Sequence, residues 1–169
     1  LFKLENMKPV ILIREPFDWL VSTYTQHNNS DDSKSFKADT INHKLIRDQL
    51  SKIEKYISHW LEYLSKKEND FLLIRYERLV NEPLKYFNEV LKLYDYGVID
   101  NDILKRAIEV NSRDFSLKFL GAKYRGTRFK DIDLKEMNKK NIQGIAKEII
   151  MKKGIDKKYQ ELIKFQKEI

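Results

Sequence analysis

The sequence predicts an α/β fold in which helices flank a parallel sheet. Two short apolar runs, Val10–Ile13 and Phe71–Ile74, have the length and composition of strands that are buried on both faces. The segment between them and most of the later chain carry apolar residues at helical spacing, so the carboxyl-terminal half is expected to be rich in helix. Strands separated by helices are typical of parallel sheets, because a parallel connection needs a long crossover.

Length and composition bound the possible functions. The 169 residues fit one domain, residues 1–169, which is long enough to bury a sizeable core. The net charge of +7 suits an anionic partner, although lysine is common throughout the chain and raises the charge without a binding purpose. The absence of cysteine excludes disulfides and thiolate metal sites, and the three histidines leave little for a zinc centre, so no metal is expected. No apolar run approaches the roughly 20 residues that span a bilayer, and a cytoplasmic protein is expected.

The first run ends in three residues that break it, Arg14, Glu15 and Pro16. A helix is expected to begin at Pro16, because proline fits the first helical turn at no cost in hydrogen bonds. Its apolar residues share one face: Leu20, Val21 and Tyr24. Arg14 therefore lies at the carboxyl end of a strand, which is the edge where open α/β sheets bind their ligands.

A polar loop and a long helix follow. The stretch His27–Ala38 is expected to be a loop, for which substrate contact and simple tolerance of insertion are equally open. A long amphipathic helix is expected from Thr40 to about Lys66 and is expected to pack against the sheet. Its apolar positions alternate steps of four and three: Ile46, Leu50, Ile53, Ile57, Trp60 and Leu64.

The second strand again ends in polar residues, Arg75, Tyr76 and Glu77. If the two strands are parallel, their carboxyl ends meet at one edge of the sheet. We therefore expect Arg14 and Tyr76 to lie on the same rim.

The rest of the chain is expected to form four helices and a loop. The helices are, in order, Pro83–Tyr94, Asp100–Val110, Asp133–Lys153 and Lys157–Ile169. Gly97 and Gly154 are expected to end the first and the third. The first two helices are expected to cover the sheet, and the basic stretch Arg113–Asp131 is expected to be an ordered loop.

No complete catalytic motif is present, and what remains is a set of groups on one rim. All five glycines follow residue 96, and none of them forms an intact phosphate loop. Arg14 offers a planar fork of donors to a phosphate, and Ser22 in the next helix adds a hydroxyl. The alternative is that Arg14 pairs with Glu15 or Glu77 and that Ser22 only packs or faces solvent.

Three segments resemble sulfotransferases that use 3′-phosphoadenosine 5′-phosphosulfate (PAPS). The 3′-phosphate motif of that family is an Arg, an Asp or Asn, a Pro and a Ser eight residues after the Arg. Arg14, Pro16 and Ser22 match it in type and spacing, and Glu15 occupies the second position. The segment Arg75–Val80 resembles the family's Arg-Tyr-Glu-Asp-Leu segment, and Tyr124–Gly126 is similar to its late Arg, variable residue, Gly loop. The three segments occur in the family's order.

The resemblance implies a fold related to P-loop nucleotide hydrolases and binding of PAPS or of adenosine 3′,5′-bisphosphate. Arg14 and Ser22 would bind the 3′-phosphate, and Tyr76 would lie near the adenine. Arg125 and Gly126 would donate to the same phosphate.

The chain also departs from the family pattern. Glu15 replaces the usual Asp or Asn, and Arg78 replaces an Asp. Because Arg128 is close to the late motif, the choice between Arg125 and Arg128 stays open. The family's loop for the 5′-phosphosulfate and its general base precede this region, so we expect the carboxyl-terminal portion of a sulfotransferase domain that is incomplete at its amino end.

The activity implied by the resemblance is in-line transfer of a sulfuryl group to an acceptor hydroxyl or amine. The sequence identifies neither the catalytic base nor the oligomeric state, and the acceptor could be a carbohydrate, a lipid or a small molecule. One alternative is a non-catalytic domain that binds adenosine bisphosphate. A basic nucleic-acid-binding domain is less favoured, because the lysines scatter over helix faces among Asp and Glu.

Overall fold

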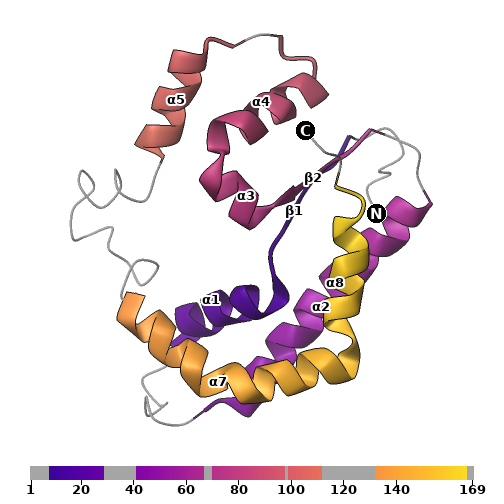
Figure 1. The fold of residues 1–169 in the computed structure, drawn as a ribbon, viewed down its shortest axis with the longest axis vertical. Helices are drawn as coiled ribbons and strands as arrows, with labels where there is room; N and C mark the ends of the chain where they lie inside the picture. Colours follow the sequence, from indigo (N-terminus) through magenta and orange to yellow (C-terminus); the bar gives the residue numbers. More distant parts are fainter. Residues whose placement is uncertain (1–7, 29–40, 67–69, 98, 112–131, 167–169) are drawn as a thin grey trace.

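The computed structural model describes residues 8–28, 41–66, 70–97, 99–111 and 132–166, and in this part of the chain two strands lie side by side (Figure 1). They are β1 (Val10–Ile13) and β2 (Leu72–Arg75), and they pair in parallel with Ile13 opposite Arg75. The predicted parallel pairing is confirmed. The second strand lies one residue later than expected, because Phe71 precedes the first paired residue.

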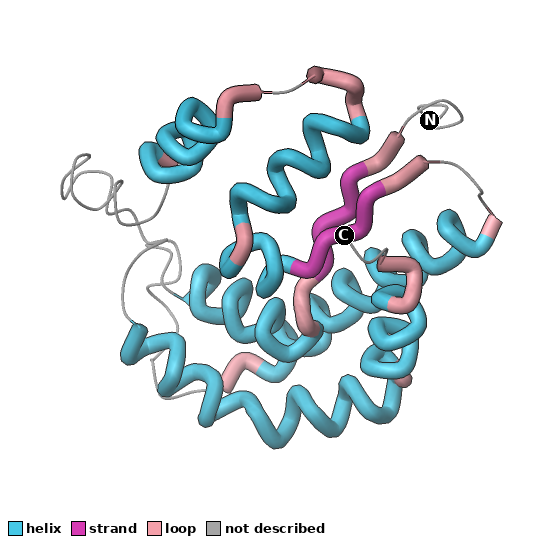
Figure 2. Tube along the Cα trace, turned by 45° about the horizontal axis from the view of Figure 1, so that its top comes forward, coloured by secondary structure: helices cyan, strands magenta, loops and turns pink. Residues whose placement is uncertain are grey.

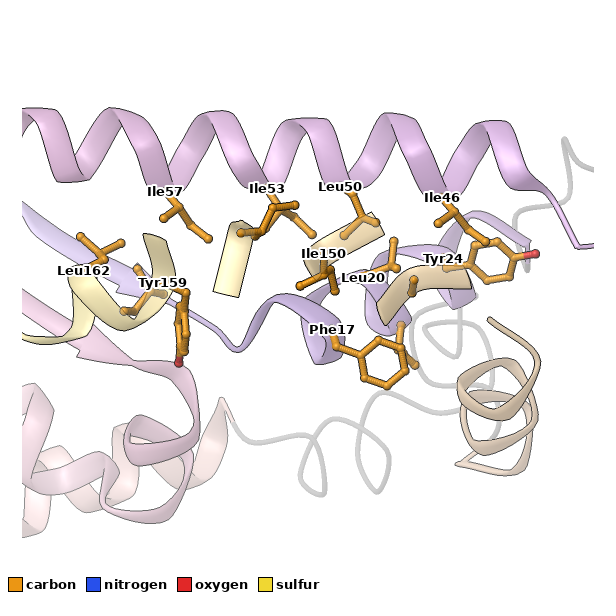
Figure 3. Close-up of a cluster of buried hydrophobic side chains, with 14 of the residues drawn as sticks. Phe17, Leu20, Tyr24, Ile46, Leu50, Ile53, Ile57, Ile150, Tyr159 and Leu162 are labelled. Atoms are coloured by element: carbon orange, nitrogen blue, oxygen red, sulfur yellow. The ribbon is translucent and has the colours of Figure 1, made fainter. Parts of the chain in front are cut away.

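Four helices pack together around one core that also includes one face of the strand pair. They are α1 (Pro16–Asn28), α2 (His43–Ser65), α7 (Ile132–Lys153) and α8 (Ile155–Ile163). Of these, α7 lies farthest from the strands in Figures 1 and 2. Their buried side chains form the larger apolar core together with Ile11, Ile13 and Leu73 of the strands (Figure 3). The predicted start of α1 at Pro16 and the buried face of α2 are confirmed.

A smaller cluster covers the opposite face of the strands. Helices α3 (Tyr76–Asn81) and α4 (Pro83–Leu93) follow β2 directly, and Leu72, Ile74 and Tyr86 are buried between them. The sequence did not predict α3, because six residues are too few to show helical periodicity. Leu12 remains 42% exposed, so the prediction that β1 is buried on both faces is wrong.

Helix α5 (Asn101–Val110) packs on the outside of α4, away from the strands (Figure 1). It has no buried residue, so the prediction that this segment covers the sheet is wrong. None of the described helices is both long enough and apolar enough to cross a membrane.

The helix ends follow local hydrogen bonding. Helix α4 ends at Leu93, Asp95 beyond it has a φ of 56°, and the N–H of Tyr96 donates to the carbonyl of Leu91 at 3.0 Å. This is a Schellman arrangement, so Asp95 rather than the predicted Gly97 terminates the helix. Gly154, with a φ of 65°, separates α7 from α8 as predicted, and α8 begins at Ile155 rather than Lys157.

The predicted loop Arg113–Asp131 and most of the predicted loop His27–Ala38 lie outside the described residues.

Candidate functional site

Glu15 builds the turn between β1 and α1. Its carboxylate accepts hydrogen bonds from the backbone N–H of Asp18 at 2.7 Å and from that of Phe17 at 3.1 Å. These donors belong to the first turn of α1, where backbone N–H groups have no partner within the helix. Glu15 therefore caps α1 and fixes the direction in which the chain leaves the strand.

A side chain that follows β2 holds this turn in place. Oε1 of Glu77 accepts a hydrogen bond from the backbone N–H of Glu15 at 3.3 Å, and Oε2 of Glu77 lies 3.8 Å from Nε of Arg75. Residues that follow the two parallel strands are thus joined across 62 positions of sequence. The ends of β1 and β2 form one polar rim, as their parallel arrangement predicts.

Arg14 stacks on Tyr76 at this rim. The guanidinium carbon of Arg14 lies 4.6 Å from the ring centroid of Tyr76, which is a cation–π contact. The expectation that these residues share one rim is confirmed. Nε of Arg14 is buried and has no hydrogen-bond partner among the described residues.

The alternative ion pair of Arg14 is not formed. The carboxylate of Glu15 binds the first turn of α1, and the carboxylate of Glu77 binds the backbone of Glu15 and faces Arg75. No described carboxylate pairs with Arg14, so its positive charge is not neutralised by an ion pair within the described chain. A planar cation in this state is suited to bind an anion.

The other predicted site residues are only partly located. Ser22 lies in the second turn of α1 and is half-buried, and its hydroxyl has no hydrogen-bond partner among the described residues. Arg125, Gly126 and the competing Arg128 lie outside the described residues. The structure therefore brings Arg14 and Tyr76 into contact and places Ser22 on the helix that follows Arg14.

Burial shifts two pKa values behind the rim. Burial raises the pKa of the Glu15 carboxyl, although the hydrogen bonds from Asp18 and Phe17 oppose this shift. Burial also raises the pKa of the Tyr159 hydroxyl on α8, while the nearby charge of Arg75 opposes the shift. Within the described segments, no group of three or more His, Cys, Asp or Glu residues is placed to hold a metal ion.

Sequence reasoning missed the supporting residues of the rim. A carboxylate immediately before Pro16 is a recognisable signal for a helix cap, and it could have identified the role of Glu15. The repetition of Arg and Glu at both strand ends hinted at Glu77. No local signal marks Tyr159, because it reaches the rim only through the packing of α8.

This arrangement places the chain among α/β proteins whose polar groups gather at the carboxyl edge of parallel strands. The chain belongs to the sulfotransferase family, because the family model described as sulfotransferase domain matches residues 1–164. The match confirms the resemblance found in the sequence and supports a sulfotransferase activity in general terms. Neither the curated proteins nor the solved structures gave a match.

Proposed function

We propose that this chain binds the adenosine 3′,5′-bisphosphate portion of PAPS in a sulfotransferase that modifies an acceptor hydroxyl or amine. The observation that carries the proposal is Arg14, which lies at the carboxyl end of β1, stacks on Tyr76 and pairs with no described carboxylate. Family membership supplies the reaction class. We also propose that the fold of this chain is related to that of P-loop nucleotide-binding proteins.

The residues at the rim fit a nucleotide that carries a 3′-phosphate. The buried Nε of Arg14 lacks a partner among the described residues, and a phosphate oxygen satisfies such a donor. Tyr76 is 38% exposed, so part of its ring is open to an adenine while another part supports Arg14. Ser22 would add a hydroxyl donor to the phosphate.

The late motif completes the proposed site. Arg125 and the backbone of Gly126 would add donors to the same phosphate, with Arg128 as the alternative to Arg125. PAPS, when bound, supplies an activated sulfuryl group. The residues of this chain bind and orient the nucleotide, and we assign no proton transfer to them. The acceptor class stays open among carbohydrates, lipids and small molecules.

The proposal is tested by calorimetric titration of the chain with adenosine 3′,5′-bisphosphate and with adenosine 5′-monophosphate, which lacks the 3′-phosphate. The bisphosphate is expected to bind more tightly. Arg14→Ala removes charge-assisted hydrogen bonds worth about 1.5–3 kcal/mol, so it should weaken bisphosphate binding roughly 10- to 150-fold. The matched control is Arg106→Ala, which removes an exposed arginine on α5.

Two results would contradict the proposal. The first is equal affinity of the unaltered chain for the two nucleotides, and the second is unchanged bisphosphate binding in Arg14→Ala. If duplex DNA binds with a steep salt dependence and the bisphosphate does not bind, the chain is a nucleic-acid-binding domain instead.

A further inference from the structure

A group of buried polar atoms lies behind the rim, on the face of the strands covered by α8. Tyr159 is only 3% exposed, yet its hydroxyl makes no hydrogen bond of good geometry with the described residues. Nε of Arg75 and Oε2 of Glu77 are also buried without such a partner. Figure 3 shows the hydroxyl of Tyr159 pointing away from the apolar side chains of α2.

The three side chains come from different elements but converge on one place. Arg75 ends β2 on the same face as Leu73, which packs in the core shared with α8. Burial raises the pKa of the Tyr159 hydroxyl, and both the charge and the hydrogen-bonding groups of the nearby Arg75 guanidinium oppose that rise. Nε of Arg75 lies 3.8 Å from Oε2 of Glu77. The other oxygen of Glu77 holds the backbone of Glu15.

Packing alone does not account for this arrangement. A phenylalanine at position 159 would fill the same apolar space without burying a hydroxyl, and buried polar atoms without partners cost free energy. Unsatisfied polar atoms in a native core are expected to have a functional reason. Here Glu77 connects them to the backbone of Glu15, the residue that follows Arg14.

We propose that Tyr159, Arg75 and Glu77 are positioning residues for the 3′-phosphate site. Tyr159 orients the guanidinium of Arg75, Arg75 faces the carboxylate of Glu77, and Glu77 fixes the backbone N–H of Glu15. This inference rests on the proposed function.

The test measures the preference for adenosine 3′,5′-bisphosphate over adenosine 5′-monophosphate, expressed as the ratio of their dissociation constants. Tyr159→Phe and Glu77→Gln are expected to reduce this preference three- to tenfold while monophosphate binding stays the same. The matched control is Tyr86→Phe, a buried tyrosine on the opposite face of the strands, which should keep the full preference. A merely structural role would lower the melting temperature without changing the preference.

The outcomes separate the two proposals. If the unaltered chain does not prefer the bisphosphate, the proposed function fails. If it does prefer the bisphosphate and both variants keep the full preference, only the positioning role is overturned. Should Tyr159→Phe fail to fold, Glu77→Gln decides the question, because the Glu77 side chain is one-third exposed and glutamine keeps its size.

Discussion

Arg14 and Glu15 are neighbours in the sequence with opposite surroundings at the sheet edge. The Glu15 carboxylate accepts hydrogen bonds from two backbone N–H groups of α1. The Arg14 guanidinium instead stacks on the ring of Tyr76 and forms no ion pair with a described carboxylate. The Asp or Asn usual at this position in the family has a side chain one methylene shorter than that of glutamate. The longer Glu15 side chain still accepts hydrogen bonds from the N–H groups of Phe17 and Asp18. The departure at Glu15 therefore leaves the helix cap in place.

Substitution of Tyr76 separates the role of its ring from that of its hydroxyl. Tyr76→Phe keeps the aromatic face on which Arg14 stacks, so bisphosphate binding should change less than twofold. Tyr76→Leu removes a cation–π contact worth about 0.5–1 kcal/mol at a partly exposed site, which corresponds to a roughly two- to fivefold loss of affinity. Calorimetric titration measures both variants. An equal loss in the two would show that the hydroxyl, rather than the ring, supports binding.

The raised pKa of Glu15 predicts a pH dependence of stability. A carboxyl whose pKa is higher in the folded state contributes stability that is present below its unfolded value of about 4.5 and is lost as the pH rises through the folded pKa. Glu15→Gln does not titrate. The unfolding free energy of the unaltered chain, minus that of the variant, should therefore fall as the pH rises above 4.5. Urea unfolding at several pH values measures this difference in unfolding free energy. A difference that rises with pH would refute the raised pKa of Glu15.

Secondary-structure elements differ in how far the sequence could predict them. Helices α1 and α2 were predictable because their buried residues recur at helical spacing over several turns. The end of α4 could not be predicted, because a left-handed conformation such as that of Asp95 is unusual for a residue other than glycine. Whether an amphipathic helix such as α5 packs against the sheet depends on the path of the chain in space. The spacing of apolar residues carries no information about that path.

The same limit applies to the site. The positions of Arg14 and Tyr76 followed from two strand ends and parallel pairing, which are local signals joined by one topological rule. The contribution of Tyr159 depends on the packing of α8 into the core that includes Leu73 of β2, although 79 residues separate the two elements, and no short motif encodes it.

One glutamate links three helices. Glu54 on α2 accepts hydrogen bonds from Lys153 at the end of α7 and from Lys158 on α8, each at 3.0 Å. Both lysines lower the pKa of the Glu54 carboxyl, mainly through these hydrogen bonds. The contact spans elements that are about 100 residues apart in the sequence, so it constrains how the carboxyl-terminal helices dock.

Glu54→Gln should reduce stability at neutral pH by about 0.5–1 kcal/mol, the range of partly exposed ion pairs. Because the folded pKa is lowered, this contribution is present above the unfolded value of 4.5 and disappears as the pH falls through the folded pKa. Urea unfolding at neutral and acidic pH measures the effect. The control is Glu62→Gln, which breaks an exposed pair with Lys66 at the end of α2, joins no second helix and should have a smaller effect.

At the scale of the whole molecule, the two strands separate clusters of unequal size. The larger cluster joins α1, α2, α7 and α8, whereas the smaller one consists of a few residues between β2, α3 and α4. Helix α5 adds no buried residue to either cluster. Stability should therefore be concentrated on the α8 side of the strands, which is also the side that supports the proposed phosphate site from behind.

This distribution predicts different costs for two truncations to alanine. Leu162 on α8 is 0% exposed and lies one turn beyond Tyr159, whereas Ile103 on α5 is 65% exposed. Leu162→Ala should cost about 2–5 kcal/mol, and for a domain of this size it should lower the melting temperature by about 4–20 °C. Ile103→Ala should change stability by less than about 0.5 kcal/mol. Thermal and urea unfolding measure both variants, and equal losses would mean that α5 contributes to the core as much as α8 does.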